Sequence, residues 1–241
     1  MPDLSSVVLP WEEAAEASTV DRVIGAMATL HTHRRPAAAL ADGPWCPLRE
    51  RVLLLSRPAA EGYRAAGNPV GERFLTGWDA FDAAVPAPAR DLIAGLSREP
   101  APLLAALSRM PATLIHGDLK LANVGFAPDG RIALIDWQMV TVAPVAVELG
   151  WFLVSNAPSL PMQPQAVLDR YREAATTAGD ASTAEAWATQ VDLAILVGLL
   201  LRGWRKGIDT AAQARYPSGE RAADDLAWWA DRAVEAAARR L

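Results

Sequence analysis

Strand-like sequence is concentrated in one stretch of this chain, between Ala112 and Thr141. The runs ATLIH, NVGFA and RIALID within it are short and rich in Val, Ile, Leu and Phe. The last two flank Pro128-Asp129-Gly130, which is typical of a β-hairpin. On either side, apolar residues recur at helical spacing instead. The pattern therefore predicts a mainly helical α+β protein with a small β core, assigned to residues 111–141.

The helical part before the β core is expected over residues 18–110. Ser18 stands where an N-cap is expected, ahead of an apolar stripe that recurs every three or four residues. A second helix is predicted to begin at about Pro47, because proline is tolerated in the first turn. The stripe of the first helix consists of Val20, Val23, Ile24, Met27 and Leu30.

Helical spacing returns over residues 142–241. Ala184 to Gly203 is apolar nearly all round, which predicts a buried helix. The longest apolar run, Leu193 to Leu201, is well short of the roughly 18–20 residues that cross a bilayer, so no membrane partner is expected. Two further stripes are expected to face the core, namely Val167, Leu168 and Tyr171, and Leu226, Trp229, Val234 and Leu241.

Composition narrows the function classes. A chain of 241 residues, 51% of them hydrophobic, is long enough for a substantial core. The net charge is −5 and no dense run of Lys and Arg is present, so a nucleic-acid partner is not expected. One cysteine, Cys46, allows no internal disulfide, and the N-terminus lacks the features of a signal peptide. The cytoplasm is the expected location.

The β core also contains a cluster of polar residues with informative spacing. His116-Gly117-Asp118 is followed by Asn123 and, after the hairpin, by Asp136. Carboxylate and amide oxygens are ligands that Mg²⁺ accepts, often with substrate phosphates completing its shell. If Asn123 and Asp136 hold the metal, Asp118 is free to accept the proton of an attacking hydroxyl. The alternative interpretation is that these residues only cap backbone amides in turns.

The segment HGDLKLAN, together with IDW, resembles the catalytic loop and metal-binding segment of the aminoglycoside phosphotransferase and choline kinase family, within the protein-kinase-like fold. The resemblance implies that Asp118 is the catalytic base, that Asn123 and Asp136 bind Mg²⁺, and that His116 braces the loop. It also implies that Lys120 faces the transferred phosphate of ATP. The acceptor would be the hydroxyl of a small molecule.

The resemblance extends over nearly the whole chain. DRVIGAMATLHTH, VELGWFL and LDRYREA look like helices of the family's C-terminal lobe, although Glu148 stands where Asp is more usual. Residues 11–241 are therefore expected to form a single C-lobe, with residues 1–10 as a hinge-like segment. No Gly-x-Gly and no lysine precedes Lys120, so the nucleotide-gripping N-lobe is expected to be absent. The face that an N-lobe would cover is expected to favour a homodimer.

Three functions follow from these observations. The first is transfer of the ATP γ-phosphoryl group to a substrate hydroxyl. The second is a non-catalytic binding or regulatory module, or a truncated remnant, that retains the fold. The third is a metal-dependent phosphoesterase that uses the same carboxylates.

Other polar residues have two interpretations each. His31 and His33 are expected at a helix end rather than around a metal, and Cys46 in the core rather than as a nucleophile. Five acids in the C-terminal part either line a site for a cationic substrate or, as is more usual, mark an exposed helix face; they are Asp192, Asp209, Asp224, Asp225 and Asp231.

Overall fold

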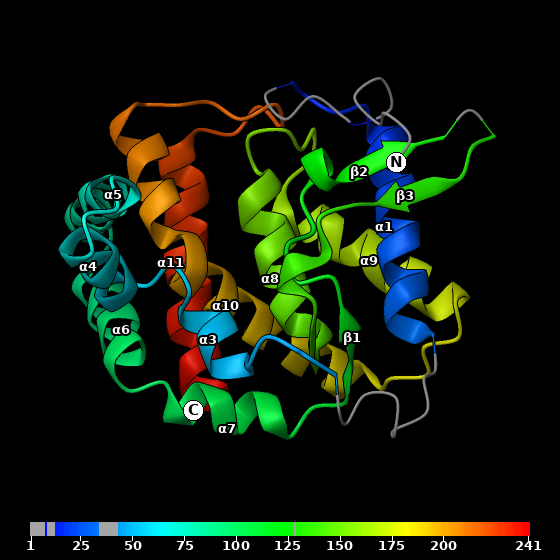
Figure 1. Ribbon diagram of the computed structural model, residues 1–241, viewed down its shortest axis with the longest axis horizontal. Helices are drawn as coiled ribbons and strands as arrows, with labels where there is room; N and C mark the ends of the chain where they lie inside the picture. The colour runs from blue at the N-terminus through cyan, green and yellow to red at the C-terminus, as the bar shows by residue number, and fades with distance from the viewer. Residues whose placement is uncertain (1–7, 9–12, 34–42, 128) are drawn as a thin grey trace.

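The computed structural model describes residue 8 and residues 13–33, 43–127 and 129–241. Helices make up most of it and surround two small sheets (Figure 1). Before the β core lie α1 (Ala17–Thr32), α3 (Leu48–Leu53), α4 (Arg57–Ala65), α5 (Val70–Ala84), α6 (Ala87–Arg98) and α7 (Ala101–Ser108). After it lie α8 (Val145–Asn156), α9 (Pro164–Thr177), α10 (Ala184–Ala211) and α11 (Ala222–Arg240). The expected mainly helical α+β class is confirmed.

The β core consists of two antiparallel pairs of strands. Strands β2 (Val124–Phe126) and β3 (Ile132–Leu134) form the hairpin that the sequence predicts. Strand β1 (Ala112–Ile115) pairs with β4 (Thr141–Pro144), which the sequence analysis missed. Two short 3-10 helices, η1 (Leu121–Asn123) and η2 (Trp137–Met139), lie before β2 and after β3. The pairing of β1 with β4 brings both ends of the polar segment together, because Ile115 lies opposite Thr141.

Helix α10 is the centre of the helical core. It packs most extensively against α8, α5 and α11, and the run Leu193 to Leu201 is buried as expected. Helices α8 and α10 approach closely at two glycines, since a Cβ on Gly150 would lie 2.3 Å from the carbonyl oxygen of Ala194, and one on Gly198 would lie 2.9 Å from the carbonyl oxygen of Gly150. By length and composition α10 alone among the described helices could cross a membrane, but 67% of its apolar window is buried in the fold.

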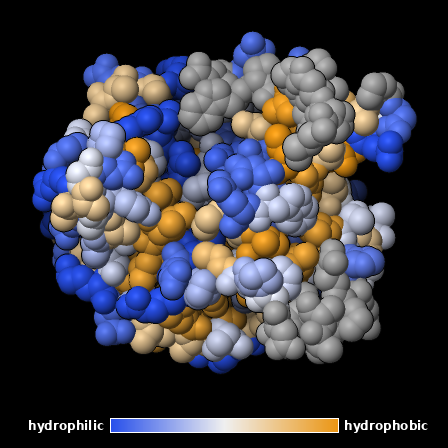
Figure 2. All heavy atoms as spheres, in the orientation of Figure 1, coloured by the Kyte–Doolittle hydropathy of each residue, from blue (hydrophilic) through white to orange (hydrophobic). Residues whose placement is uncertain are grey.

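The buried face of α10 is interrupted once. Arg202 has non-helical backbone angles, φ −135° and ψ 16°, so two helical stretches meet there at a kink. At this kink, Arg202 lines a cavity together with Asp118. On the face shown in Figure 2, hydrophilic side chains cover the outer helices α4 and α5, and hydrophobic ones show mainly between the helices.

Several details differ from the predictions. Helix α1 begins at Ala17 with Glu16 as its N-cap residue, not Ser18, and no side chain caps it. Leu241 is 44% exposed because α11 ends at Arg240, one residue before it. The expected helix at Pro47 is confirmed as α3. Of the predicted hinge-like segment 1–10, all but Val8 lies outside the described residues, and Val8 forms an antiparallel bridge with Gly125 of β2.

Candidate functional site

The segment from His116 to Asn123 leaves β1 in a sharp turn that only glycine permits. Gly117 has φ +84°, in the left-handed region that is unfavourable for residues with a Cβ. A Cβ at this position would also lie 1.9 Å from the carbonyl oxygen of Met139. The turn therefore packs directly against η2, and it brings Asp118 beneath the segment that follows Asp136.

The turn at His116 and Gly117 is held in place by Glu148, which lies in the first helical turn of α8. Its carboxylate accepts hydrogen bonds from the backbone N–H groups of His116 at 3.0 Å and Gly117 at 2.6 Å. His31 adds a third hydrogen bond of 2.9 Å through Nε2. Burial alone would raise the pKa of Glu148, but the hydrogen bonds from His31, His116 and Gly117 bring this pKa below its usual value. The carboxylate is thus ionised although it is fully buried.

The hydrogen bonds around Glu148 continue through His31 to helix α9. His31 Nδ1 lies 2.8 Å from the hydroxyl of Tyr171 in α9. Burial, together with the charges of Asp180 and Glu148, raises the pKa of Tyr171 well above its usual value, so the hydroxyl keeps its proton. Because the ionised carboxylate of Glu148 can only accept, His31 donates to it from Nε2, and the ring of His31 links Glu148 to the hydroxyl of Tyr171. His31 is a structural residue at a helix end, whereas His33 is exposed.

The imidazole of His116 joins the turn to the strand that precedes Asp136. Its Nε2 lies 2.8 Å from the carbonyl oxygen of Ile135, and its Nδ1 accepts a hydrogen bond of 3.3 Å from the backbone N–H of Asp118. These partners require the proton on Nε2. The backbone of Ile135 also donates to the carbonyl oxygen of Asn123 at 3.0 Å. Ile135 therefore couples the position of Asp136 to that of Asn123.

Asp118 has one carboxylate oxygen with partners and one without. Its Oδ2 forms an ion pair of 2.9 Å with Lys120 and accepts from Asn123 Nδ2 at 3.3 Å. Asn123 also donates to the backbone carbonyl of Asp118 at 2.8 Å. The Oδ1 atom is buried and has no hydrogen-bond partner among the described residues. An unsatisfied buried acceptor is costly in a folded protein, and Asp118 is also one of the residues that line a cavity.

The two predicted metal ligands differ in exposure. Asn123 is 8% exposed, and because its amide nitrogen is engaged by Asp118, its Oδ1 remains free to bind a cation. Asp136 is exposed, and it has φ +63°, a strained conformation for a residue that is not glycine. No cluster of three or more His, Cys, Asp or Glu side chains suited to a metal occurs among the described residues. Two protein oxygens plus substrate phosphates fit Mg²⁺, which retains other ligands.

A cavity of about 310 Å³ opens beside Asp118, and Gln138 and Met139, which follow Asp136, form part of its wall. Its wall combines the turn with helices α3, α5, α8 and α10, which are distant in sequence. The residues that matter for its chemistry are Asp118, Lys120, Arg51, Arg73, Arg202 and Arg205, with the rings of Trp151 and Trp204. Neither Asn123 nor Asp136 lines it. The candidate site thus has a metal-binding side and a separate cavity that meet at Asp118.

A sequence model of a phosphotransferase enzyme family matches residues 6–186, which include His116, Asp118, Lys120, Asn123 and Asp136 but not Arg202 and Arg205 of the cavity. The chain belongs to this phosphotransferase enzyme family. No curated protein matches the chain. Among solved structures, choline kinase LicA from Streptococcus pneumoniae is similar with a TM-score of 0.46 and 14% identity, over 98% of this chain and 69% of that one.

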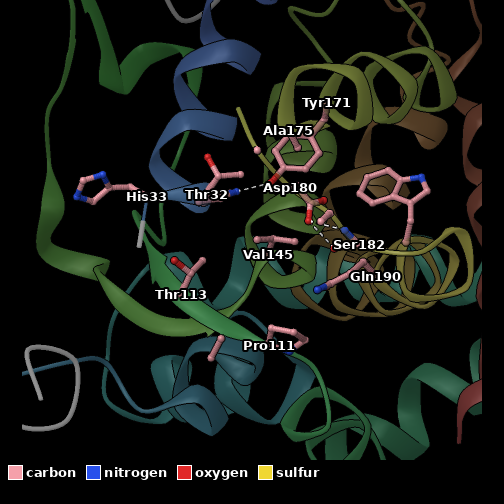
Figure 3. A pocket seen from close by; sticks show the side chains of 15 residues that line it. Thr32, His33, Pro111, Thr113, Val145, Tyr171, Ala175, Asp180, Ser182 and Gln190 are labelled. Carbon is pink, nitrogen blue, oxygen red and sulfur yellow. Dashed lines mark hydrogen bonds between the residues drawn. The ribbon is translucent and has the colours of Figure 1, made fainter. Parts of the chain in front are cut away.

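Membership of the phosphotransferase family does not explain another cavity, of about 430 Å³, near the opposite end of β1. Figure 3 shows its wall, where Tyr171, Asp180, Ser182 and Gln190 lie on one side and Thr32 and His33 on another. None of the predicted site residues lines it. Two of its lining residues, His31 and Tyr171, are linked to the candidate site, because Tyr171 hydrogen bonds with His31 and His31 hydrogen bonds with Glu148.

Several side chains of this phosphotransferase site were not found by sequence reasoning. Asn156 at the end of α8 accepts from the backbone N–H of Leu121 at 2.8 Å and so holds η1. A polar residue in an otherwise apolar helix was the signal for it. Arg51 and Arg202 converge on the ring of Trp151 from distant parts of the chain, at 4.5 Å and 5.3 Å. The local sequence around each arginine does not predict that both contact Trp151.

Four of the five acids in the C-terminal part have basic partners. Asp192 pairs with Arg239 and Arg240, Asp209 with Arg205, Asp224 with Arg221, and Asp225 with Lys206. Asp192, Asp209 and Asp225 are buried, so the expectation of an exposed helix face was wrong for these three. None of the five lines the cavity beside Asp118. Cys46 is half-buried, and burial raises the pKa of its thiol, which disfavours the nucleophilic thiolate.

Proposed function

We propose that this chain transfers the γ-phosphoryl group of ATP to the hydroxyl of a small molecule, in the cytoplasm. Membership of the phosphotransferase enzyme family supports this reaction class. The observation that carries the proposal is the carboxylate of Asp118, whose Oδ1 is buried without a partner at the edge of a cavity large enough for a small molecule.

In the proposed reaction the acceptor hydroxyl lies against Asp118 Oδ1 and donates its hydrogen bond to it. The hydroxyl oxygen forms a bond to the γ-phosphorus as the bond from that phosphorus to the bridging oxygen of ADP breaks. The proton of the hydroxyl moves to Asp118, which acts as the general base. Lys120, paired with Asp118 at 2.9 Å, places a positive charge where the transferred phosphoryl group carries negative charge.

Asn123 and Asp136 would hold Mg²⁺ in this proposal. When bound, this ion neutralises phosphate charge and orients the triphosphate. The residues of this chain position it through the backbone of Ile135, which hydrogen bonds both to Asn123 and to His116. His116 is a positioning residue in this proposal, because its ring hydrogen bonds to the backbone of Ile135 and Asp118 and packs against the ring of Trp137 at 4.6 Å.

The first experiment is titration calorimetry of the chain with ATP and Mg²⁺. We expect binding that requires Mg²⁺ and is lost in Asp136→Ala. The matched control is Asp129→Ala, because Asp129 is an exposed carboxylate in the same hairpin whose partner is the surface residue Arg131. Loss of binding in both variants, or binding independent of Mg²⁺, would contradict the metal assignment.

Turnover separates the three candidate functions. Asp118→Asn should retain nucleotide binding and lose about 10²–10⁴-fold in ADP formation with an acceptor present. Nucleotide-independent release of phosphate from phosphate esters would instead indicate a phosphoesterase. A chain that binds neither ATP nor phosphate esters would be a non-catalytic module. The division into a hinge-like segment at residues 1–10 and one C-lobe at residues 11–241 remains a prediction, and so does the homodimer.

A further inference from the structure

The cavity beside Asp118 is strongly basic although the chain as a whole is acidic. Five basic residues line it, and Asp118 is its one acidic lining residue. The net charge of the chain is −5, so this concentration of positive charge runs against the composition. A neighbouring hollow of about 370 Å³ shares Arg73, Lys120, Arg202 and Arg205, so the basic wall continues beyond the cavity.

Two of these arginines lie deep and lack the partners that buried charges normally have. Arg51 is 0% exposed, and all three of its guanidinium nitrogens are without hydrogen-bond acceptors among the described residues. Arg202 has a buried Nε that is also unsatisfied. Burial lowers the pKa of each to about 10, and nearby carboxylates only partly offset this effect. Both guanidinium groups lie over the ring of Trp151.

The indole groups of the wall add further unused donors. The Nε1 atoms of Trp151 and Trp204 are buried without an acceptor. Apart from Asp118 Oδ1, every unsatisfied buried atom of the lining residues is therefore an N–H donor. Because buried donors without acceptors cost free energy, this surplus points to a ligand that brings acceptor oxygens.

The carboxylates around the cavity do not balance its charge. Asp209 is engaged by Arg205 Nε at 2.9 Å and by the hydroxyl of Tyr216 at 3.2 Å. Glu148 is engaged by His31 and by two backbone N–H groups. Arg73 is exposed, and its guanidinium group lies over the face of Trp204 at 6.0 Å. A cationic acceptor would meet like charge on most of this wall.

We propose that the phosphoryl acceptor of this chain is an alcohol that carries an anionic group, a carboxylate or a phosphate ester, bound by Arg202 with Arg73 and Arg205 beside it and Arg51 behind. The hydroxyl of the same molecule lies at Asp118. Arginine suits such a site because its planar N–H groups bind carboxylate and phosphate in pairs. This inference rests on the proposed function, since it names the substrate of the same site.

The phosphates of ATP are another anionic group that these arginines could bind. The predicted Mg²⁺ ligands, Asn123 and Asp136, do not line the basic cavity, whereas helices α3, α5 and α10 do. The arginines of the cavity thus lie on helices, whereas Asn123 and Asp136 lie next to the two strands of the hairpin, β2 and β3. We assign the arginines to the acceptor, and the experiment below separates the two sources.

The test measures binding of four probes by calorimetry without nucleotide, namely D-glycerate, glycerol 3-phosphate, glycerol and choline, and binding of ATP with Mg²⁺ in parallel. The variants are Arg202→Met and the exposed Arg73→Gln, which does not depend on a buried side chain. The matched control is Arg49→Met, because Arg49 lies in the same helix as Arg51 but is exposed and does not line the cavity.

We expect the anionic alcohols to bind at least about tenfold more tightly than glycerol or choline, and each cavity variant to weaken them about tenfold. Arg49→Met should bind the probes as the parent does, and ATP affinity should be unchanged in all three variants. The proposal is overturned if choline or glycerol binds as tightly as the anionic alcohols, or if neither anionic probe binds up to about 10 mM. It is also overturned if the cavity variants weaken the binding of ATP and not that of the anionic probes. Failure of ATP binding in the parent, with anion binding intact, would contradict the proposed function and not the anion site.

Discussion

The carboxylate of Glu148 accepts a hydrogen bond of 2.6 Å from the backbone N–H of Gly117, the residue before Asp118. The same carboxylate accepts from the N–H of His116 and from His31, so three donors from two segments meet on one buried anion. The geometry of the turn that carries Asp118 therefore depends on an ionised side chain that lies outside the cavity.

Glu148→Gln should destabilise the fold by about 3 kcal/mol, because an amide can accept from one donor but places its NH₂ group against another. Urea unfolding monitored by circular dichroism measures the change. Glu61→Gln is the control, because Glu61 is an exposed glutamate and its substitution should change stability by less than about 0.5 kcal/mol. Equal stability of the two variants would show that Glu148 does not hold the turn.

The pH dependence of stability follows from the same residue. In the folded protein the pKa of Glu148 is below the ordinary glutamate value of 4.5, so the contribution of its carboxylate to stability is fully present above pH 4.5 and is lost as the pH falls through the lower pKa of the folded state. The groups that face it are His31, the N–H groups of the turn and the guanidinium of Arg51. We expect the parent to lose stability more steeply than Glu148→Gln between about pH 5 and pH 3. Parallel curves would contradict this.

Two glycines with nearly the same backbone angle provide a test of the packing at the turn. Gly117 has φ +84° and Gly130 has φ +83°, but a Cβ on Gly130 meets nothing within 4 Å. Gly130→Ala should cost about 1 kcal/mol from the backbone angle alone. Gly117→Ala should cost at least about 2 kcal/mol more, because its Cβ meets the carbonyl of Met139. Thermal unfolding of both variants gives the difference, and equal costs would contradict the close packing.

Buried cations with and without partners should respond in opposite directions to the same substitution. Arg51→Met should raise the free energy of unfolding by about 1 kcal/mol, because it removes a buried charge that has no acceptor. Lys206→Met should lower it by about 3 kcal/mol, because it leaves buried Asp225 without its cation. Urea unfolding measures both. A loss of stability in Arg51→Met would mean that the guanidinium contributes through its contact with Trp151.

The class of fold, the hairpin and the position of the polar turn were predictable because their signals are local. Proline, aspartate and glycine mark the turn between β2 and β3, and the helical stripes of α1 and α9 repeat within a few residues. Strand β4 was missed because its four residues lead directly into a helix and lack a turn signal of their own.

The cavity was not predictable, because its wall depends on contacts between residues far apart in the chain. Arg51 and Arg202 meet at Trp151 only after α3, α8 and α10 have packed, and each arginine alone resembles an ordinary surface residue in the sequence. The buried role of Glu148 was partly visible, since the sequence marks it as a departure from an expected aspartate. Its three partners became clear only from the structure.

Asp118 stands between two groups of residues that share few structural supports. The metal-side residues belong to the β core, whereas the basic wall is contributed largely by helices α3, α5 and α10. Under the proposed function, substitutions in those helices are expected to alter which alcohol is accepted and to leave binding of the phosphoryl donor unchanged. A division of this kind would let substrate preference change in evolution through the helices while the residues of the β core stay the same.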